Sequence, residues 1–169
     1  MNKKHSIQSS SKLISIEEVE FIEKCGVIYE KKIGLPRIAG KIIGFLLISD
    51  PLEQNLSEIQ KTLKVSKASV SNMMRIIEKV GFIEKITLPG ERTAFYRMAS
   101  LNEEFLRSSV DDNREFRKLM EVGLKVVKKK QSHLQLRIKE WHSFYKFAEE
   151  KFPSLFRQWL KKRKASLKI

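Results

Sequence analysis

The chain has 169 residues, and its 34 Lys and Arg against 20 Asp and Glu give a formal net charge of +14. An apolar fraction of 41% supplies enough side chains for a hydrophobic core, which excludes wholesale disorder. A single cysteine, Cys25, excludes an intramolecular disulfide framework and a zinc site built on several cysteines. The stretch Ser6–Ser11 is too polar for a signal peptide, and the longest apolar run, Ile42–Ile48, is too short to span a bilayer. We therefore expect a cytoplasmic protein that does not enter a membrane.

A positive charge of this size attracts polyanions such as DNA, RNA or an anionic membrane surface. Basic residues are concentrated at the C-terminus, where no acid follows Lys151, and this tail supplies half of the net charge: Lys151, Arg157, Lys161, Lys162, Arg163, Lys164 and Lys168. The run 161–164 fits two interpretations, a contact with phosphate or a solvated and frayed end of a helix.

The first half of the chain predicts helices separated by clear stop signals. Residues 1–14 are polar and predict a flexible segment, after which Ser15 and Glu18 form a capping box that opens a helix ending at Gly34. A second helix, from Arg37 to about Ser49, is apolar nearly all round and should be central. Its glycines, Gly40 and Gly44, lie on one face and predict the close approach of another helix.

Between Leu56 and Met98 the spacing of the apolar residues changes once, after Gly81, from a helical period of about 3.6 residues to the alternation of a strand. Ser57 to Gln60 reads as a capping box for a short helix, and Ser66 caps a longer helix from Lys67 to Val80. The apolar positions of this longer helix, which we expect to face inward, are Val70, Met73, Ile77 and Val80. After Gly81 the apolar residues alternate on both sides of a Pro89-Gly90 turn, which indicates a β-hairpin. Helix, tight turn, helix and hairpin together predict a winged helix-turn-helix.

The chain from Asn102 onward predicts helix to its end. One run of apolar residues alternates steps of four and three, as in a heptad seam, and is expected to form a dimerisation surface: Leu134, Ile138, Trp141, Tyr145, Ala148 and Phe152. Pro153 is expected to break this helix and to leave a last short amphipathic helix containing Phe156 and Trp159.

The outward face of the helix after Ser66 is the candidate nucleic-acid surface. Small side chains at its start allow close approach to base edges, Asn72 can pair with adenine, and Arg75 can pair with guanine or contact phosphate. The candidate DNA-binding residues are Ser66, Lys67, Ala68, Ser69, Ser71, Asn72, Arg75 and Lys79 on the helix, with Lys85 and Arg92 on the wing. The alternative is an ordinary solvated amphipathic helix, but the preceding helix, the wing and the net charge favour DNA.

Other chemistry is poorly supported by the residues. Cys25 lies on an apolar helix face and is expected to be a small core residue. The three histidines are scattered, and the sequence shows no metal-ligand spacing, phosphate loop, dinucleotide fingerprint or nucleophile elbow. We therefore predict no catalytic residues, no metal and no cofactor, and a protein that is not an enzyme.

Parts of the sequence resemble GbsR-type transcriptional regulators, a branch of the MarR-like winged-helix group. The resemblance covers roughly residues 17 to 100 and rests on GLPRIAGKIIG at 34–44, LLISDP at 46–51, LKVSKASVS at 63–71, VGFI at 80–83 and LPGER at 88–92. The long C-terminal helices resemble the family in pattern only.

This resemblance implies a homodimeric regulator, most often a repressor, that binds an operator through the second helix and the wing. Some GbsR-like members respond to choline-type osmolytes and control osmoprotectant genes, which implies a small-molecule effector such as a quaternary ammonium. Aromatic residues of the C-terminal region fit either a cage for such a cation or packing of the dimer core: Trp141, Phe144, Tyr145, Phe147, Phe152, Phe156 and Trp159.

The sequence thus predicts a mainly α protein with a small β-hairpin wing. Its parts are a flexible segment, 1–14, a winged helix-turn-helix domain, 15–100, and a helical dimerisation region with a basic tail, 101–169. The predicted function is a sequence-specific, DNA-binding transcriptional regulator. The alternatives are an RNA-associated protein, disfavoured by the absence of aromatic pairs on a sheet that would stack bases, and a protein–protein interaction module.

Overall fold

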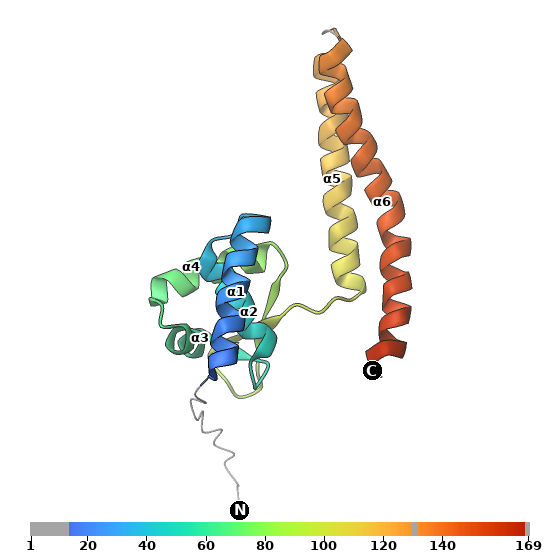
Figure 1. Ribbon diagram of the computed structural model, residues 1–169. Helices are drawn as coiled ribbons and strands as arrows, with labels where there is room; N and C mark the ends of the chain where they lie inside the picture. Colours follow the sequence, from blue (N-terminus) through green and yellow to red (C-terminus); the bar gives the residue numbers. More distant parts are fainter. Residues whose placement is uncertain (1–13, 130–131, 168–169) are drawn as a thin grey trace, which may run out of the picture. The chain divides into compact units, whose positions relative to one another are not determined.

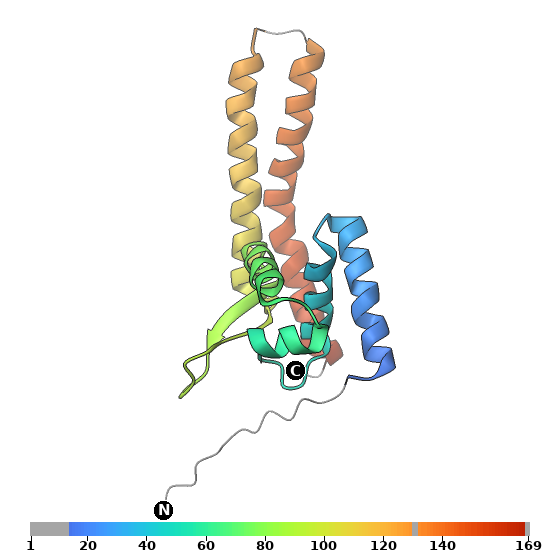
Figure 2. The same ribbon diagram turned by 90° about the vertical axis from the view of Figure 1, so that its left-hand side faces the viewer.

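The computed structural model describes residues 14–129 and 132–167, which form two compact units that divide between Ala99 and Ser100. The N-terminal unit contains α1 (Ile16–Ile33), α2 (Arg37–Ile48), β1 (Gln54–Asn55), α3 (Leu56–Leu63), α4 (Lys67–Lys79), β2 (Ile83–Thr87) and β3 (Ala94–Met98). The C-terminal unit contains α5 (Glu103–Val127) and α6 (Ser132–Leu167), which run antiparallel side by side (Figures 1 and 2). No helix in these two described stretches is both long enough and apolar enough to cross a membrane.

Helix α2 lies at the centre of the N-terminal unit because its apolar residues point in nearly every direction. Ile42 and Ile43 are fully buried, and the same core includes Ile59 of α3 and Ile83 of β2. Complete burial of such a side chain stabilises the fold by roughly 1.5–3 kcal/mol. This core fixes the position of α4, which packs against both α2 and α3.

The predicted close approach at the α2 glycines is confirmed. A Cβ atom at Gly40 would lie 2.9 Å from the backbone oxygen of Cys25, and one at Gly44 would lie 2.8 Å from the Cβ of Cys25. The expectation for Cys25 is also confirmed: it is a buried core residue, and burial raises the pKa of its thiol. Small residues on α2 therefore let α1 and α2 cross almost backbone to backbone.

The capping box of α3 differs from the prediction. Asn55, not Ser57, is the N-cap: its Oδ1 accepts a hydrogen bond from the Glu58 backbone N–H at 3.0 Å, and the Glu58 carboxylate accepts one from the Asn55 N–H at 2.8 Å. Asn55 can do this because it is also the last residue of β1, whose extended backbone suits an N-cap. The helix consequently begins at Leu56, two residues earlier than an N-cap at Ser57 would place it.

The predicted hairpin is confirmed, and it belongs to a three-stranded antiparallel sheet in the order β1-β3-β2. Ile83 pairs with Met98 and Thr87 with Ala94, while the Pro89-Gly90 turn is closed by a hydrogen bond from the Glu91 N–H to the Leu88 oxygen at 3.1 Å. The third strand, β1, was not expected, because two residues are too few to show an alternating pattern.

In the C-terminal unit, rings and one glycine hold α5 against α6. Phe116 stacks on Tyr145 with ring centroids 5.0 Å apart, and Phe105 meets Phe156 at 5.6 Å. A Cβ atom at Gly123 would lie 3.2 Å from the Cδ1 of Ile138, so this glycine faces a side chain of α6.

The predicted helix break at Pro153 is wrong, because α6 continues through this proline to Leu167. Phe152 and Phe156 lie on either side of Pro153, with ring centroids 5.7 Å apart, and Phe156 is buried against α5. A proline removes one backbone hydrogen bond, but ring packing on both sides of it holds the two halves in one helix. The alternative of a frayed basic end is likewise not observed at Arg163, whose guanidinium lies over the Trp159 ring and donates to the Leu101 oxygen at 2.9 Å.

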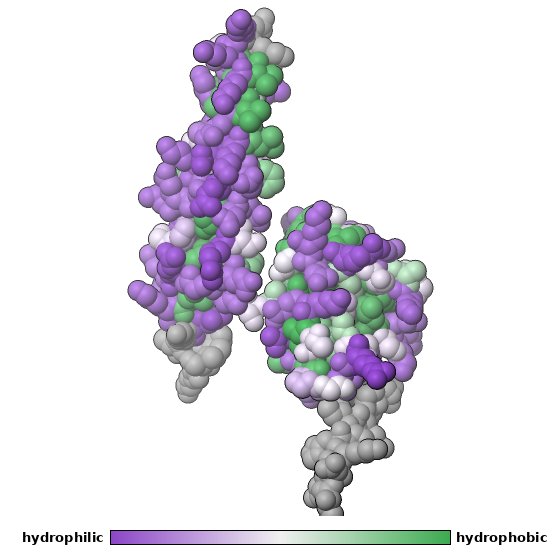
Figure 3. Space-filling model, turned by 180° about the vertical axis from the view of Figure 1, so that it is seen from behind, coloured by the Kyte–Doolittle hydropathy of each residue, from purple (hydrophilic) through white to green (hydrophobic). Residues whose placement is uncertain are grey.

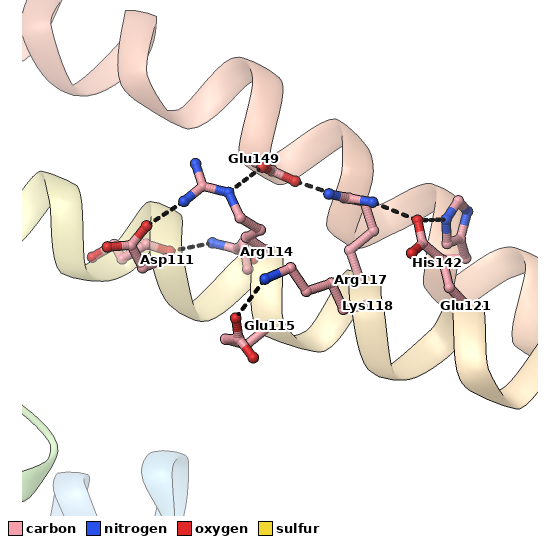
Figure 4. Close-up of polar contacts among 10 residues, drawn as sticks. Asp111, Arg114, Glu115, Arg117, Lys118, Glu121, His142 and Glu149 are labelled. Atoms are coloured by element: carbon pink, nitrogen blue, oxygen red, sulfur yellow. Dashed lines mark hydrogen bonds and ion pairs between the residues drawn. The ribbon is translucent and has the colours of Figure 1, made fainter.

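A line of charged groups crosses between the two long helices (Figure 4). Glu149 of α6 accepts hydrogen bonds from Arg114 and Arg117 of α5 at 2.9 and 2.8 Å, one on each carboxylate oxygen. The hydrogen bonds from Arg117 and Arg114 lower the pKa of Glu149, and the same carboxylate raises the pKa of both arginines. Arg117 also pairs with Glu121, whose carboxylate lies 3.5 Å from a ring nitrogen of His142.

Candidate nucleic-acid interface

Helix α4 is an amphipathic helix with one face in the core and one face in solvent. Val70, Met74 and Ile77 are buried, and the half-buried Met73 packs against the same core, as predicted for three of the four inward positions. The fourth, Val80, is 53% exposed because it is the C-cap and leaves the helical path. The inward stripe therefore leaves the predicted polar face free.

The start of α4 is organised by serines. The Ser66 hydroxyl accepts a hydrogen bond from the Ser69 backbone N–H at 3.2 Å and lies 2.9 Å from the Ser69 hydroxyl. The first turn holds no acid, so the positive end of the helix dipole is not neutralised there. A helix start of this kind attracts phosphate groups.

The predicted site residues of the N-terminal unit all lie at least partly in solvent. Ser69 and Ser71 are half-buried, and the remaining positions are exposed: Ser66, Lys67, Ala68, Asn72, Arg75, Lys79, Lys85 and Arg92. Within α4, the guanidinium of Arg75 donates a hydrogen bond to the Oδ1 of Asn72, one turn earlier on the same exposed face. The spacing of three residues could have indicated this contact from the sequence.

A charged cluster at the base of the wing was not anticipated. Arg97 of β3 donates to Glu84 of β2 at 2.5 Å and to Glu53 at 3.4 Å, and its hydrogen bond to Glu84 raises the pKa of Arg97. Arg97 is thus neutralised within the unit, whereas Lys85 and Arg92 project from the wing into solvent. Sequence could not show the Glu53 contact, since 44 residues separate it from Arg97.

Two of the six residues of the predicted dimerisation seam face α5 of the same chain. Ile138 faces Gly123, and Tyr145 stacks on Phe116, so both contact α5 of the same chain. Trp141 is 55% exposed and stacks on Tyr145, and Ala148 and Phe152 are half-buried. The side chain of the sixth residue, Leu134, is outside what the structure describes.

Six of the seven candidate aromatic residues gather in two groups within the helical unit, and the seventh, Phe147, is exposed. Trp141, Phe144 and Tyr145 contact one another with ring centroids 5.5–6.1 Å apart. Phe156 contacts both Phe152 and Trp159, and the cation over Trp159 is the chain's own Arg163. These rings therefore pack against each other in the isolated chain.

Comparison with known proteins finds transcriptional regulators whose sequences are similar to this chain. The family model described as MmpR5-like MarR family transcriptional regulator matches residues 102–162. The chain is 28% identical, over 136 residues, to the HTH-type transcriptional regulator MmpR5 of Mycobacterium tuberculosis, covering 78% of this chain and 79% of that protein.

A solved structure described as a transcriptional regulator superposes with a TM-score of 0.76 at 25% identity, covering 86% of this chain and 99% of that one. The matched family model falls on α5 and α6, the part in which the sequence resembled regulators in pattern only. The chain is thus similar in sequence and in fold to transcriptional regulators, and its helical hairpin is similar to the model of MmpR5-like MarR family regulators.

Proposed function

We propose that this regulator binds duplex DNA by placing the first turns of α4 in the major groove, with Lys85 and Arg92 of the wing on the flanking backbone. The observation that carries the proposal is the exposed polar face of α4, which is held in place by a buried apolar face. Between Lys67 and Ile77 this helix carries no acid, so nothing on its leading turns repels phosphate.

The proposed active form is a homodimer that uses the helical hairpin. Exposed apolar side chains follow one face of α5 (Phe116, Leu119, Val122 and Val126) and one face of α6 (Leu136, Phe144, Phe147 and Leu155). Figure 3 shows apolar residues in a strip along this hairpin. On α6 this strip is displaced from the predicted seam by about a third of a turn, at roughly 100° per residue. The strip adds a surface for a second copy, while Ile138 and Tyr145 of the predicted seam contact α5.

The finer assignments rest on the resemblance of roughly residues 17 to 100 to GbsR-type regulators. They are repression relieved by a small effector, a quaternary ammonium as that effector, and control of osmoprotectant genes. The aromatic groups of the hairpin supply faces of the type that bind such cations.

The decisive experiment is selection of bound fragments from random duplex DNA, read for a dyad motif. A two-fold dimer places its recognition helices about one DNA turn, roughly 34 Å, apart. Arg75→Ala should weaken operator binding by roughly 1–3 kcal/mol and blur base preference, whereas Lys24→Ala, which removes an exposed charge from α1, should not. Arg92→Ala should weaken all sequences alike and flatten the dependence of affinity on salt.

Unchanged operator affinity in Arg75→Ala would contradict the assignment of α4. Preference for RNA over duplex DNA at matched salt would favour the RNA-associated alternative. A mass in light scattering that corresponds to a monomer would favour the protein–protein interaction module, because the apolar strip would then be free to bind a different protein.

A further inference from the structure

The hydrogen bond between Asn72 and Arg75 limits how α4 can read a base, given the proposed DNA binding. Both side chains are exposed, and the contact joins the amide oxygen of Asn72 to the guanidinium of Arg75. Two other arginines of the N-terminal unit, Arg37 and Arg97, are held by carboxylates. Arg75 is held by a neutral amide, so its positive charge is oriented without being neutralised.

The groups that this pair offers outward are hydrogen-bond donors. An asparagine that pairs with adenine uses its oxygen to accept from the N6 amino group and its amide nitrogen to donate to N7. The Asn72 oxygen already accepts from Arg75, so only its second lone pair remains for the adenine amino group, which would have to bind beside the positively charged guanidinium. Guanine presents two acceptors, N7 and O6, in the major groove, and these match the free N–H groups of Arg75.

We propose that Asn72 is a positioning residue that holds Arg75 for guanine, so that each half-site contains a guanine under this pair and no adenine read by Asn72. A guanidinium that is already held loses less rotamer freedom when it binds. Asn72 then determines base preference through Arg75.

The test uses the full-length protein and the operator selected by the wild type. Relative affinities for all four bases at each half-site position are measured for the wild type, Asn72→Ala, Asn72→Asp, Arg75→Ala and the Asn72→Ala/Arg75→Ala double variant. We expect Arg75→Ala to reduce the guanine preference at one position by about tenfold or more. Asn72→Ala should reduce the preference at that same position, and the double variant should be no worse than Arg75→Ala.

Two further measurements separate positioning from a general structural role. Asn72→Asp keeps the acceptor for Arg75, so it should retain the guanine preference while its negative charge weakens binding to every sequence. Replacing the guanine by 7-deazaguanine, which lacks the N7 acceptor, should weaken binding of the wild type but not of Arg75→Ala.

Three outcomes would overturn the proposal. The guanine preference of Asn72→Ala could equal that of the wild type, or Asn72→Ala could lose an adenine preference at a position of its own. The absence of any selected DNA motif would overturn the proposed function as well, whereas a motif with an unchanged Asn72→Ala profile would overturn only the role of Asn72.

Discussion

The two units of this chain differ in how completely they bury their apolar side chains. In the N-terminal unit, Ile42, Ile43 and Ile59 are 0% exposed. In the described part of the C-terminal unit, the buried apolar residues are Leu106, Val127 and Phe156. Helices and a sheet arranged around α2 enclose a core, whereas two helices side by side can bury only the stripe along which they meet.

From this difference we expect the N-terminal unit to be the more stable of the two by itself. The N-terminal unit has a closed core, and its exposed α4 face is polar, as a surface that meets a charged polymer must be. The hairpin leaves an apolar strip in solvent, and a strip of this kind indicates a surface that another molecule covers. Four predictions test the contrast, in order of decreasing effect.

The largest effect is expected from cavity formation in the N-terminal core. Ile42→Ala should lower the free energy of unfolding by roughly 2–5 kcal/mol, because surrounding helices cannot collapse into the space. Leu47→Ala, on the same helix but 48% exposed, should change it by less than about 0.5 kcal/mol. Urea unfolding followed by circular dichroism measures both, and equal losses would mean that α2 is not central.

Gly40 packs against the backbone of a neighbouring helix, whereas Gly123 faces a side chain, so alanine should have different effects at the two positions. Gly40→Ala should destabilise the protein by roughly 1–3 kcal/mol, because the new methyl group would meet the backbone of Cys25 at 2.9 Å. Gly123→Ala meets only the tip of Ile138 at 3.2 Å, and alanine gains up to about 1 kcal/mol in helix propensity. Thermal unfolding should therefore show a loss for the first variant and none for the second. A loss at Gly123 as large as at Gly40 would show that the hairpin is packed as rigidly as α1 on α2.

Charge placed on the apolar strip should separate the proposed dimer. Leu119→Glu combined with Phe147→Glu should shift the mass in light scattering from dimer to monomer and weaken operator binding by at least tenfold, about 1.4 kcal/mol. Lys118→Glu changes the net charge by as much as the double variant does, at an exposed polar position next to Leu119 where it removes a surface ion pair with Glu115, and it should leave the dimer intact. A double variant that remains dimeric would assign the interface to another surface.

The smallest effect concerns the pH dependence of the hairpin. The pKa of Glu149 is lowered below its ordinary value of 4.5 by Arg117 and Arg114. Its contribution to stability is therefore fully present above the ordinary value and is lost as the pH falls through the lowered pKa. Melting temperatures between pH 3 and 7 should show a smaller acid loss for Glu149→Gln than for the wild type. Glu150→Gln, at an exposed neighbouring position, should follow the wild type.

The local elements of this fold follow closely from the sequence. The capping box at Ser15 and Glu18, the serine cap of α4 and the Pro89-Gly90 turn depend on residues within a few positions of one another. Such signals act through local hydrogen bonds and backbone preference, so they can be read without the fold. The polar face of α4 is predictable for the same reason, because helical spacing alone separates it from the buried face.

What only the tertiary structure decided involves residues that are distant in the sequence. The strand β1 exists because β3 offers it a partner, and α6 runs through Pro153 because the rings on both sides of it pack in the hairpin. The contact of Arg97 with Glu53 likewise depends on how the loop before α3 returns to the wing. Neighbouring residues set the local preference for helix, strand or turn. Where two local structures are possible, the packing energy between residues distant in the sequence decides which one forms.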